Sequence, residues 1–119
     1  MESGLDLSDV ASAVLKFRSE RDWEQFHTPK NLATGLAIEA AELQEVFLWQ
    51  DNLTTGAVLN DDTRVQAAQE EIADITVYLL MLANDLNINL ADAVASKLLD
   101  NARRYPVEQY KVRSDKAPH

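Results

Sequence analysis

Two stretches decide the fold: residues 36–47, LAIEAAELQEVF, and residues 70–83, EEIADITVYLLMLA. In both, apolar side chains recur at every third or fourth position, which is the period of a helix with a buried face. The chain has no stretch in which apolar and polar residues alternate between turn signals, as they would in a half-buried strand. The sequence therefore predicts an all-α protein.

The residues around these stretches mark where helices begin and end. Thr28 followed by Pro29 is typical of a helix start, and Asn89 can cap a last helix that must end before Pro106. Residues 51–60, which include Asn, Gly and Thr, have the composition of a loop. We expect four main helices over about residues 8–22, 29–50, 61–86 and 90–105, the first of them weakening from Arg18 onward.

The length of 119 residues fits one domain. We place this domain at residues 1–106, followed by a tail at residues 107–119 that we expect to be partly disordered. The chain has 20 acidic and 11 basic side chains, a net charge of −9 and a pI near 4.5. Such a surface repels a phosphate backbone, so we expect no general binding of nucleic acid.

The composition also bears on where the protein works. The absence of cysteine excludes disulfides, a thiolate nucleophile and a zinc ribbon. The longest mostly apolar stretch, residues 72–83, contains an aspartate and is too short to cross a membrane. No basic segment followed by an apolar run opens the sequence. We therefore expect a soluble cytoplasmic protein without a membrane partner.

Four carboxylates stand in pairs on the two most apolar helices: Glu39 with Glu42, and Glu71 with Asp74, each pair three residues apart on one helix face. Glu39 falls on the apolar side of its helix, and Asp74 is the only charge among residues 72–83. A carboxylate in apolar surroundings must pair, take up a proton or bind a cation. One such pair alone is typical of a solvated helix, but two pairs on facing helices indicate a metal site.

The chemistry of the donors indicates which metal. Carboxylate oxygens without cysteine or a neighbouring histidine favour Mg²⁺, with Mn²⁺ as a substitute. Di-iron bundles use Glu-x-x-His pairs, and neither His27 nor His119 stands three residues after a glutamate. We therefore expect a magnesium site rather than an iron site.

Other polar and aromatic side chains allow two interpretations each, one functional and one purely structural. Tyr78 lies one turn after Asp74 and either borders the metal site or is a core tyrosine. Lys97, Asn101 and Arg104 form one stripe of their helix, which either meets phosphate or is a solvated cationic face near a helix end.

The aromatic residues on either side of the second helix are equally open to two interpretations. They offer a stacking surface for a base, or they cover the ends of the core as tryptophans often do. These residues are Trp23, Phe26, His27 and Trp49.

These motifs resemble the MazG-like, all-α nucleotide pyrophosphohydrolases. EAAE at residues 39–42 and EEIAD at residues 70–74, with 28 residues between Glu42 and Glu71, resemble the ExxE…ExxD arrangement of that family. The segment ERDWEQFHTPKNL at residues 20–32, FLW at residues 47–49 and the stretch from Lys97 to Pro106 are similar to the dCTP diphosphatase branch. The resemblance covers roughly residues 7–106.

The resemblance implies a four-helix fold completed by dimerisation, as a dimer or a tetramer of paired dimers. It implies Mg²⁺-dependent hydrolysis of nucleoside triphosphates, with dCTP or related deoxynucleotides as substrates, to the monophosphate and pyrophosphate. Vertebrate members of this branch have a ligand-contacting histidine where this sequence has Val14. The alternative is a non-catalytic acidic helical module that serves dimerisation or partner binding.

The resemblance also assigns residues to roles. Catalysis and magnesium binding fall to Glu39, Glu42, Glu71 and Asp74. The nucleotide pocket is formed by Trp23, Glu24, Gln25, Phe26, His27, Trp49 and Tyr78, with help from Lys97, Asn101 and Arg104.

Overall fold

The computed structural model describes residues 4–49 and 54–111. Within these residues the regular elements are helices and no strand occurs, so the prediction of an all-α protein is confirmed. Along the chain the elements are α1 (Leu7–Glu20), the 3₁₀-helix η1 (Trp23–Phe26), α2 (Pro29–Leu48), α3 (Thr55–Leu59), α4 (Asp62–Asp85), α5 (Leu90–Arg104) and α6 (Val107–Tyr110).

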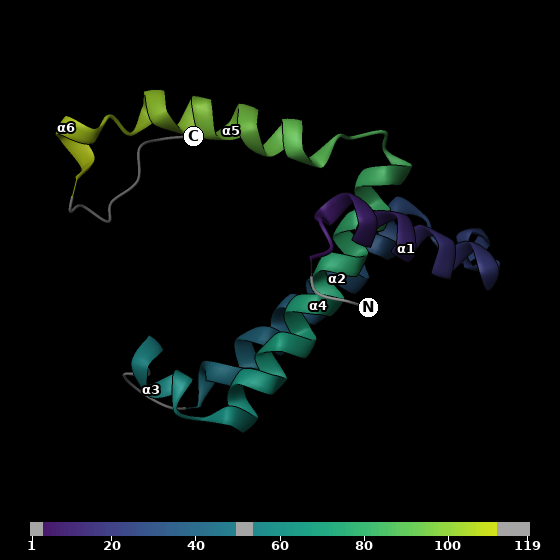
Figure 1. Cartoon of the computed structure of the whole chain (residues 1–119), viewed down its shortest axis with the longest axis horizontal. Helices are drawn as coiled ribbons and strands as arrows, with labels where there is room; N and C mark the ends of the chain where they lie inside the picture. The colour runs from purple at the N-terminus through teal and green to yellow at the C-terminus, as the bar shows by residue number, and fades with distance from the viewer. Residues whose placement is uncertain (1–3, 50–53, 112–119) are drawn as a thin grey trace. The chain divides into compact units, whose positions relative to one another are not determined.

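The chain divides into two compact units, Met1–Leu86 and Asn87–His119. In the first unit, α2 and α4 lie side by side over much of their length (Figure 1). The short α3 contacts α4 near the start of that helix, and α1 packs against α4 as well. The second unit contains α5 and α6, and within it the rings of Tyr105 and Tyr110 meet edge to face at 5.2 Å. The site described below lies within the first unit.

Side-chain caps explain where the main helices begin. Thr28 Oγ1 accepts a hydrogen bond from the backbone N–H of Asn31 at 3.1 Å, and Pro29 occupies the first turn of α2. Asp61 caps α4, and Asn89 caps α5 as the sequence predicts. α5 ends at Arg104, before Pro106, because the residue before a proline avoids helical geometry. These starts and stops are confirmed.

Three differences from the expected boundaries stand out. α1 begins one residue earlier than expected, at Leu7, because Asp6 and Asp9 form a reciprocal capping box. Part of the expected loop is the short helix α3, since Thr54 caps its first turn. The expected tail at residues 107–119 contains the single turn α6, and its remainder from residue 112 lies outside the described residues, so the predicted disorder there stays a prediction.

The core is small for a chain with 46% hydrophobic residues. Among the described residues, the buried apolar side chains are Leu32, Ala68, Leu80, Met81 and Ala83. The stretch at residues 72–83, which is apolar nearly all round, leaves Ile72 53% and Val77 37% exposed within this single chain. None of the helices in the described part of the chain combines the length and the hydropathy that crossing a membrane requires.

Candidate metal and nucleotide site

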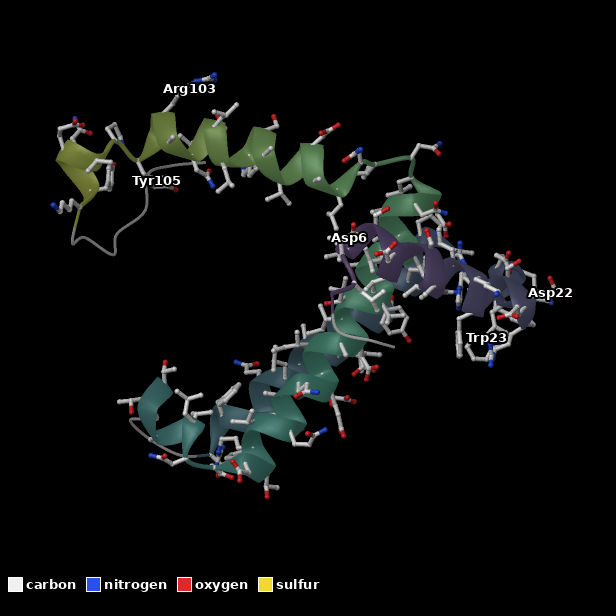
Figure 2. All side chains as sticks on the ribbon, viewed as in Figure 1. Asp6, Asp22, Trp23, Arg103 and Tyr105 are labelled. Atoms are coloured by element: carbon white, nitrogen blue, oxygen red, sulfur yellow. The ribbon has the colours of Figure 1, made fainter. Side chains whose placement is uncertain are left out.

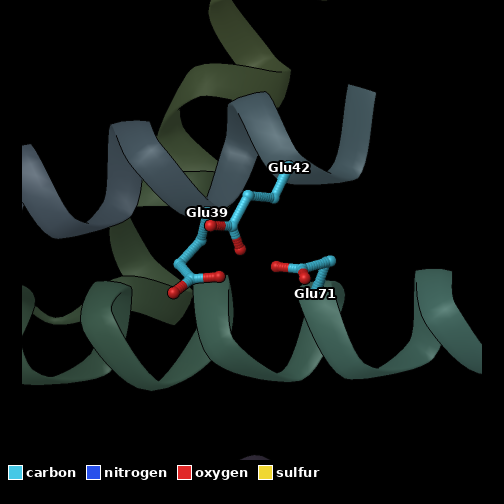
Figure 3. Close-up of side chains that lie close together, drawn as sticks. All are labelled: Glu39, Glu42 and Glu71. Atoms are coloured by element: carbon cyan, nitrogen blue, oxygen red, sulfur yellow. The ribbon is translucent and has the colours of Figure 1, made fainter. Parts of the chain in front are cut away.

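Three glutamate side chains from α2 and α4 converge (Figure 3). Glu39 and Glu42 stand three residues apart on α2, so they share the face that packs against α4, where Glu71 points back at them. One carboxylate oxygen from each residue lies within 4.8 Å of the other two. The structure therefore brings three of the four predicted carboxylates together.

The acidic cluster consists of Glu39, Glu42 and Glu71. The closeness of its carboxylates raises the pKa of two of them. The pKa of Glu39 is raised because a hydrogen bond with the Glu71 carboxyl requires a proton, and burial raises it further. The pKa of Glu42 is raised mainly by its contact with Glu39. In the described part of the chain, Oε2 of Glu39 and Oε2 of Glu71 are buried without a hydrogen-bond partner.

Unpartnered, mutually repelling carboxylate oxygens are suited to bind a divalent cation. The donor set is all oxygen, with neither sulfur nor imidazole among the three clustered residues, which fits Mg²⁺ or Mn²⁺ better than zinc. A buried carboxylate oxygen without a partner is costly, and a bound cation would remove that cost. The residues present therefore fit the metal that the sequence predicts.

Asp74, the fourth predicted carboxylate, is not part of the three-residue cluster. It follows Glu71 by one turn of α4, and its side chain is exposed. Its charge still contributes to raising the pKa of Glu39, and both residues line the same cavity. The structure therefore places Asp74 beside the acidic cluster, at the edge of the neighbouring pocket.

The pocket is a cavity of about 220 Å³ within the first unit. Three residues predicted to bind the nucleotide, Trp23, His27 and Tyr78, contribute to its wall. Its lining comes from α1, η1, α2, α4 and the residue after η1, and consists of Val14, Phe17, Arg18, Trp23, His27, Glu39, Asp74, Val77, Tyr78 and Met81. The cavity is thus acidic at Glu39 and Asp74 and largely aromatic and apolar elsewhere.

The turn after α1 builds the aromatic wall of this cavity. Asp22 adopts the left-handed conformation, with φ 54° and ψ 36°, which aspartate tolerates better than most residues. Trp23 follows Asp22 directly at this turn (Figure 2). The Trp23 ring lies against that of Phe17, with ring centroids 5.7 Å apart at 75°. The Arg21 guanidinium lies 3.6 Å from the Phe17 ring centroid, so this ring is held between a cation and a second aromatic ring.

The position of Tyr78 depends on a glycine. A Cβ atom at Gly35 of α2 would lie 2.6 Å from Cε1 and Cζ of the Tyr78 ring, which is closer than real Cβ contacts. The absence of a side chain at Gly35 therefore allows the tyrosine ring to lie against α2, one turn before Glu39.

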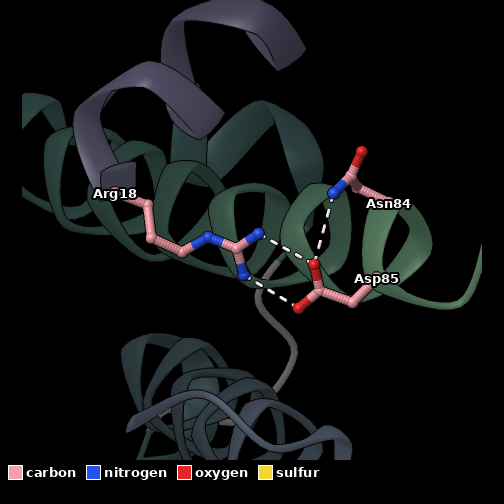
Figure 4. A network of polar contacts seen from close by, with 3 residues as sticks. All are labelled: Arg18, Asn84 and Asp85. Carbon is pink, nitrogen blue, oxygen red and sulfur yellow. Dashed lines mark hydrogen bonds and ion pairs between the residues drawn. The ribbon is translucent and has the colours of Figure 1, made fainter. Parts of the chain in front are cut away.

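Arg18 is a pocket residue that the sequence reasoning missed. The prediction treats it as one of the charges that weaken the first helix, but it belongs to the last turn of α1 and is only 5% exposed. Its Nη1 and Nη2 donate to the two carboxylate oxygens of Asp85 on α4, both at 2.8 Å (Figure 4). The available signal is its position four residues after Val14, on the inward face of the helix.

Several predicted nucleotide contacts do not line the cavity. Trp49 follows α2 and is 86% exposed, and Phe26 is 63% exposed. Glu24 and Gln25 are exposed too, and Gln25 donates a hydrogen bond to the backbone oxygen of Asp22 at 3.0 Å.

The three predicted residues of the last helix belong to the second unit. On α5, Arg104 pairs with Asp100 at 3.3 Å and Lys97 approaches the same carboxylate at 4.0 Å. Asn101 stands on the same helix and is partly buried. Their contact with a phosphate stays a prediction.

Proteins of known classification resemble this chain closely. Residues 35–117 match the MazG-like family. The dCTP pyrophosphatase 1 of Mus musculus is 41% identical over 101 residues, which are 85% of this chain and 59% of the mouse protein. The human protein of the same name is 41% identical over 100 residues, which are 84% of this chain and 59% of the relative. The chain thus spans about three fifths of the length of these relatives.

A solved structure agrees with this relationship. A pyrophosphatase from Archaeoglobus fulgidus superposes with a TM-score of 0.75 at 36% sequence identity, covering 89% of this chain and 97% of the archaeal one. The family match extends over more than half of the sequence and includes the paired carboxylates of α2 and α4. This chain belongs to the MazG-like family.

Proposed function

We propose that this protein hydrolyses nucleoside triphosphates between the α- and β-phosphates, releasing a nucleoside monophosphate and pyrophosphate. The observation that carries the proposal is the acidic cluster with its two buried, unpartnered oxygens next to a cavity lined by aromatic residues. Such a site can hold a cation and the phosphates on one side and a base on the other. The relatives named dCTP pyrophosphatase and pyrophosphatase support the same reaction.

The proposed metal ligands are Glu39, Glu42 and Glu71, together with Asp74 at the cavity edge. When bound there, Mg²⁺ would neutralise the triphosphate, lower the pKa of an attacking water and stabilise the charge on the departing pyrophosphate. Glu39 or Glu42 would accept the proton of the water, since a carboxylate of the cluster that is not fully engaged is a general base.

The cavity supports a role in binding the base. Trp23 and Phe17 offer aromatic surface, and the Tyr78 ring is fixed by its contact with Gly35. The volume of about 220 Å³ is below that of a pocket enclosing a whole drug-sized ligand, which fits one ring system with the phosphates outside. We propose dCTP or a related deoxynucleotide as the substrate, in line with the named relatives.

We also propose that the protein assembles into a dimer or a tetramer. Support comes from the small core and from the apolar side chains that α2 and α4 leave uncovered, such as Ile38 and Ile72, each 53% exposed. Uncovered apolar surface on packed helices is typical of a subunit interface. In such an assembly, the predicted nucleotide contacts outside the cavity would gain a role: Glu24, Gln25, Phe26, Trp49, Lys97, Asn101 and Arg104.

The test is to incubate the purified protein and Mg²⁺ with a panel of canonical and modified triphosphates, and to separate pyrophosphate from orthophosphate. We expect pyrophosphate and a monophosphate in equal amounts. Glu42→Gln and Asp74→Asn should abolish turnover and keep the helical far-UV spectrum. Glu70→Gln is the matched control, because Glu70 is exposed and is not one of the clustered carboxylates.

Two results would overturn the proposal. Orthophosphate as the main product would place cleavage at another bond. Absence of turnover with every triphosphate, together with a melting temperature that Mg²⁺ and nucleotide do not change, would favour the non-catalytic interaction module.

A further inference from the structure

Arg18 lies in the wall of the cavity and carries a charge opposite in sign to those of the acidic lining residues Glu39 and Asp74. Its side chain is 6% exposed, and two parallel hydrogen bonds to Asp85 fix the plane of the guanidinium (Figure 4). The pKa of Arg18 is raised chiefly by the hydrogen bond to Asp85, so the group stays a cation. A buried cation locked in one orientation can act as a fixed donor.

Of the three guanidinium nitrogens, Nη1 and Nη2 donate to Asp85, which leaves Nε. In the part of the chain that the structure describes, Nε of Arg18 is buried and has no hydrogen-bond partner. An unpartnered N–H on a buried cation is costly, because its lost hydration is not replaced. Nδ1 of His27, which lines the same cavity, is also buried without a partner. The cavity wall therefore includes two polar residues, each with a buried nitrogen that lacks a hydrogen-bond partner among the described residues.

The acidic residues determine where the phosphates and the base of a nucleotide would lie. Glu39 and Asp74 line the cavity and repel phosphate unless a cation lies between, so the cation and the phosphates belong with the acidic cluster. The remaining wall is aromatic and apolar apart from Arg18, His27 and Tyr78. Of the parts of a nucleotide, the base fits this wall best.

We propose that Arg18 is a specificity-determining residue, whose guanidinium donates a hydrogen bond to an acceptor atom of the base, a carbonyl oxygen or a ring nitrogen. This inference rests on the proposed function, because it takes the cavity to be a nucleotide pocket. A base that presents an amino group at that position would leave the Arg18 donor unsatisfied and would bind more weakly. Asp85 serves as a positioning residue, because it orients the guanidinium without lining the cavity.

The test compares a triphosphate probe that carries a nucleoside with one that carries none. One is the α,β-imido analogue of dCTP, which resists cleavage at the bond in question, and the other is inorganic tripolyphosphate. Calorimetry in Mg²⁺ gives the Kd of each for the wild type and for Arg18→Met. We expect Arg18→Met to weaken binding of the analogue about tenfold or more, as for loss of a hydrogen bond to a charged group, and to change that of tripolyphosphate less than about twofold.

The matched control is Lys16→Met, which removes a positive charge from the exposed side of the same helix. Lys16→Met should leave both Kd values unchanged. This control separates a direct contact from a change in the electrostatic potential of the whole protein. If Arg18→Met does not fold, the double variant Arg18→Met with Asp85→Leu removes both charges together, which a buried ion pair tolerates better than loss of one partner. The same comparison of probes is then made with the double variant.

If Arg18→Met weakens the binding of both probes equally, or of neither, the inference is overturned, because the base would then not be the group that Arg18 contacts. This failure is distinct from failure of the proposed function. If the wild type cleaves no triphosphate, the proposed function fails, whereas cleavage by the wild type with unchanged binding of the analogue to the variant removes only the role of Arg18.

Discussion

Replacing Gly35 with alanine should test how closely α2 and α4 must approach for the site to form. The added Cβ would lie 2.6 Å from Cε1 and Cζ of Tyr78 and 3.0 Å from its hydroxyl oxygen. An ordinary carbon contact needs about 3.5–4.0 Å, so the ring or the helix has to move by roughly 1 Å. Because Tyr78 also lines the cavity, the displacement should reach the pocket.

Two opposing contributions set the expected change in stability. Overpacking costs about 1–3 kcal/mol, whereas alanine in place of glycine inside a helix gains about 1 kcal/mol. The net loss for Gly35→Ala is therefore about 0–2 kcal/mol, or a fall in Tm of up to roughly 10 °C for a small domain. Gly56→Ala is the control, since a Cβ there would meet only Thr54 Oγ1, at 4.0 Å. It should be neutral or slightly stabilising.

A double-mutant cycle isolates the contact from the change in helix propensity. In a Tyr78→Ala background, Gly35→Ala has no ring to displace, so it should stabilise the protein by about 1 kcal/mol. Urea unfolding of the four proteins then gives a coupling energy of about 1–3 kcal/mol between positions 35 and 78. If Gly35→Ala is as favourable with the tyrosine present as without it, the close packing at this point of the site is refuted.

Further predictions concern Asp85, Trp49 and metal-dependent stability. The pKa of Asp85 is lowered from its ordinary value of 3.8, mainly by its hydrogen bond with Arg18. The unfolded chain therefore takes up the proton first as the pH falls, so this contribution to stability is complete above pH 3.8 and is lost as the pH drops toward the folded pKa. Asp85→Asn should lower stability at pH 7 and flatten the dependence of stability on pH below about pH 3.8. If urea titrations of the variant show the same loss of stability in acid as the wild type, the pair does not cause that loss. Trp49→Ala should change the free energy of unfolding by less than about 0.5 kcal/mol, because the side chain is 86% exposed, and should raise KM if the ring contacts nucleotide in an assembled oligomer. A normal KM in this variant would remove Trp49 from the pocket. Mg²⁺ should raise the Tm of the wild type in a concentration-dependent way and have no such effect on Glu42→Gln, as measured by a thermal-shift series.

Local patterns in the sequence predict most of the helical boundaries. The caps at Thr28 and Asn89 act on backbone groups three residues away, so composition and spacing are enough to place them. The helix α3 escaped prediction because a single turn after Thr54 has no hydrophobic period to detect. The pairing of acids on α2 and α4 was predictable since both motifs lie on the most apolar helices.

The parts of the site that were missed depend on contacts between distant residues. Arg18 and Asp85 are 67 positions apart, and neither residue alone shows that it is half of a bidentate pair. The contact of Gly35 with Tyr78 depends on the distance between two packed helices, which periodicity does not give. Asp74 lies one turn after Glu71 on the same face of α4, but it lines the neighbouring cavity and is not one of the clustered carboxylates.

The most direct test of the central claim is a titration of the protein with Mn²⁺, followed by the electron paramagnetic resonance signal of the free ion. We predict binding by the wild type and by Glu70→Gln, whose altered side chain is exposed and lies outside the cluster, and affinity at least about tenfold weaker in Glu71→Gln. Equal Mn²⁺ binding by Glu71→Gln and the wild type would contradict a metal site at these three carboxylates. So would the absence of binding by the wild type.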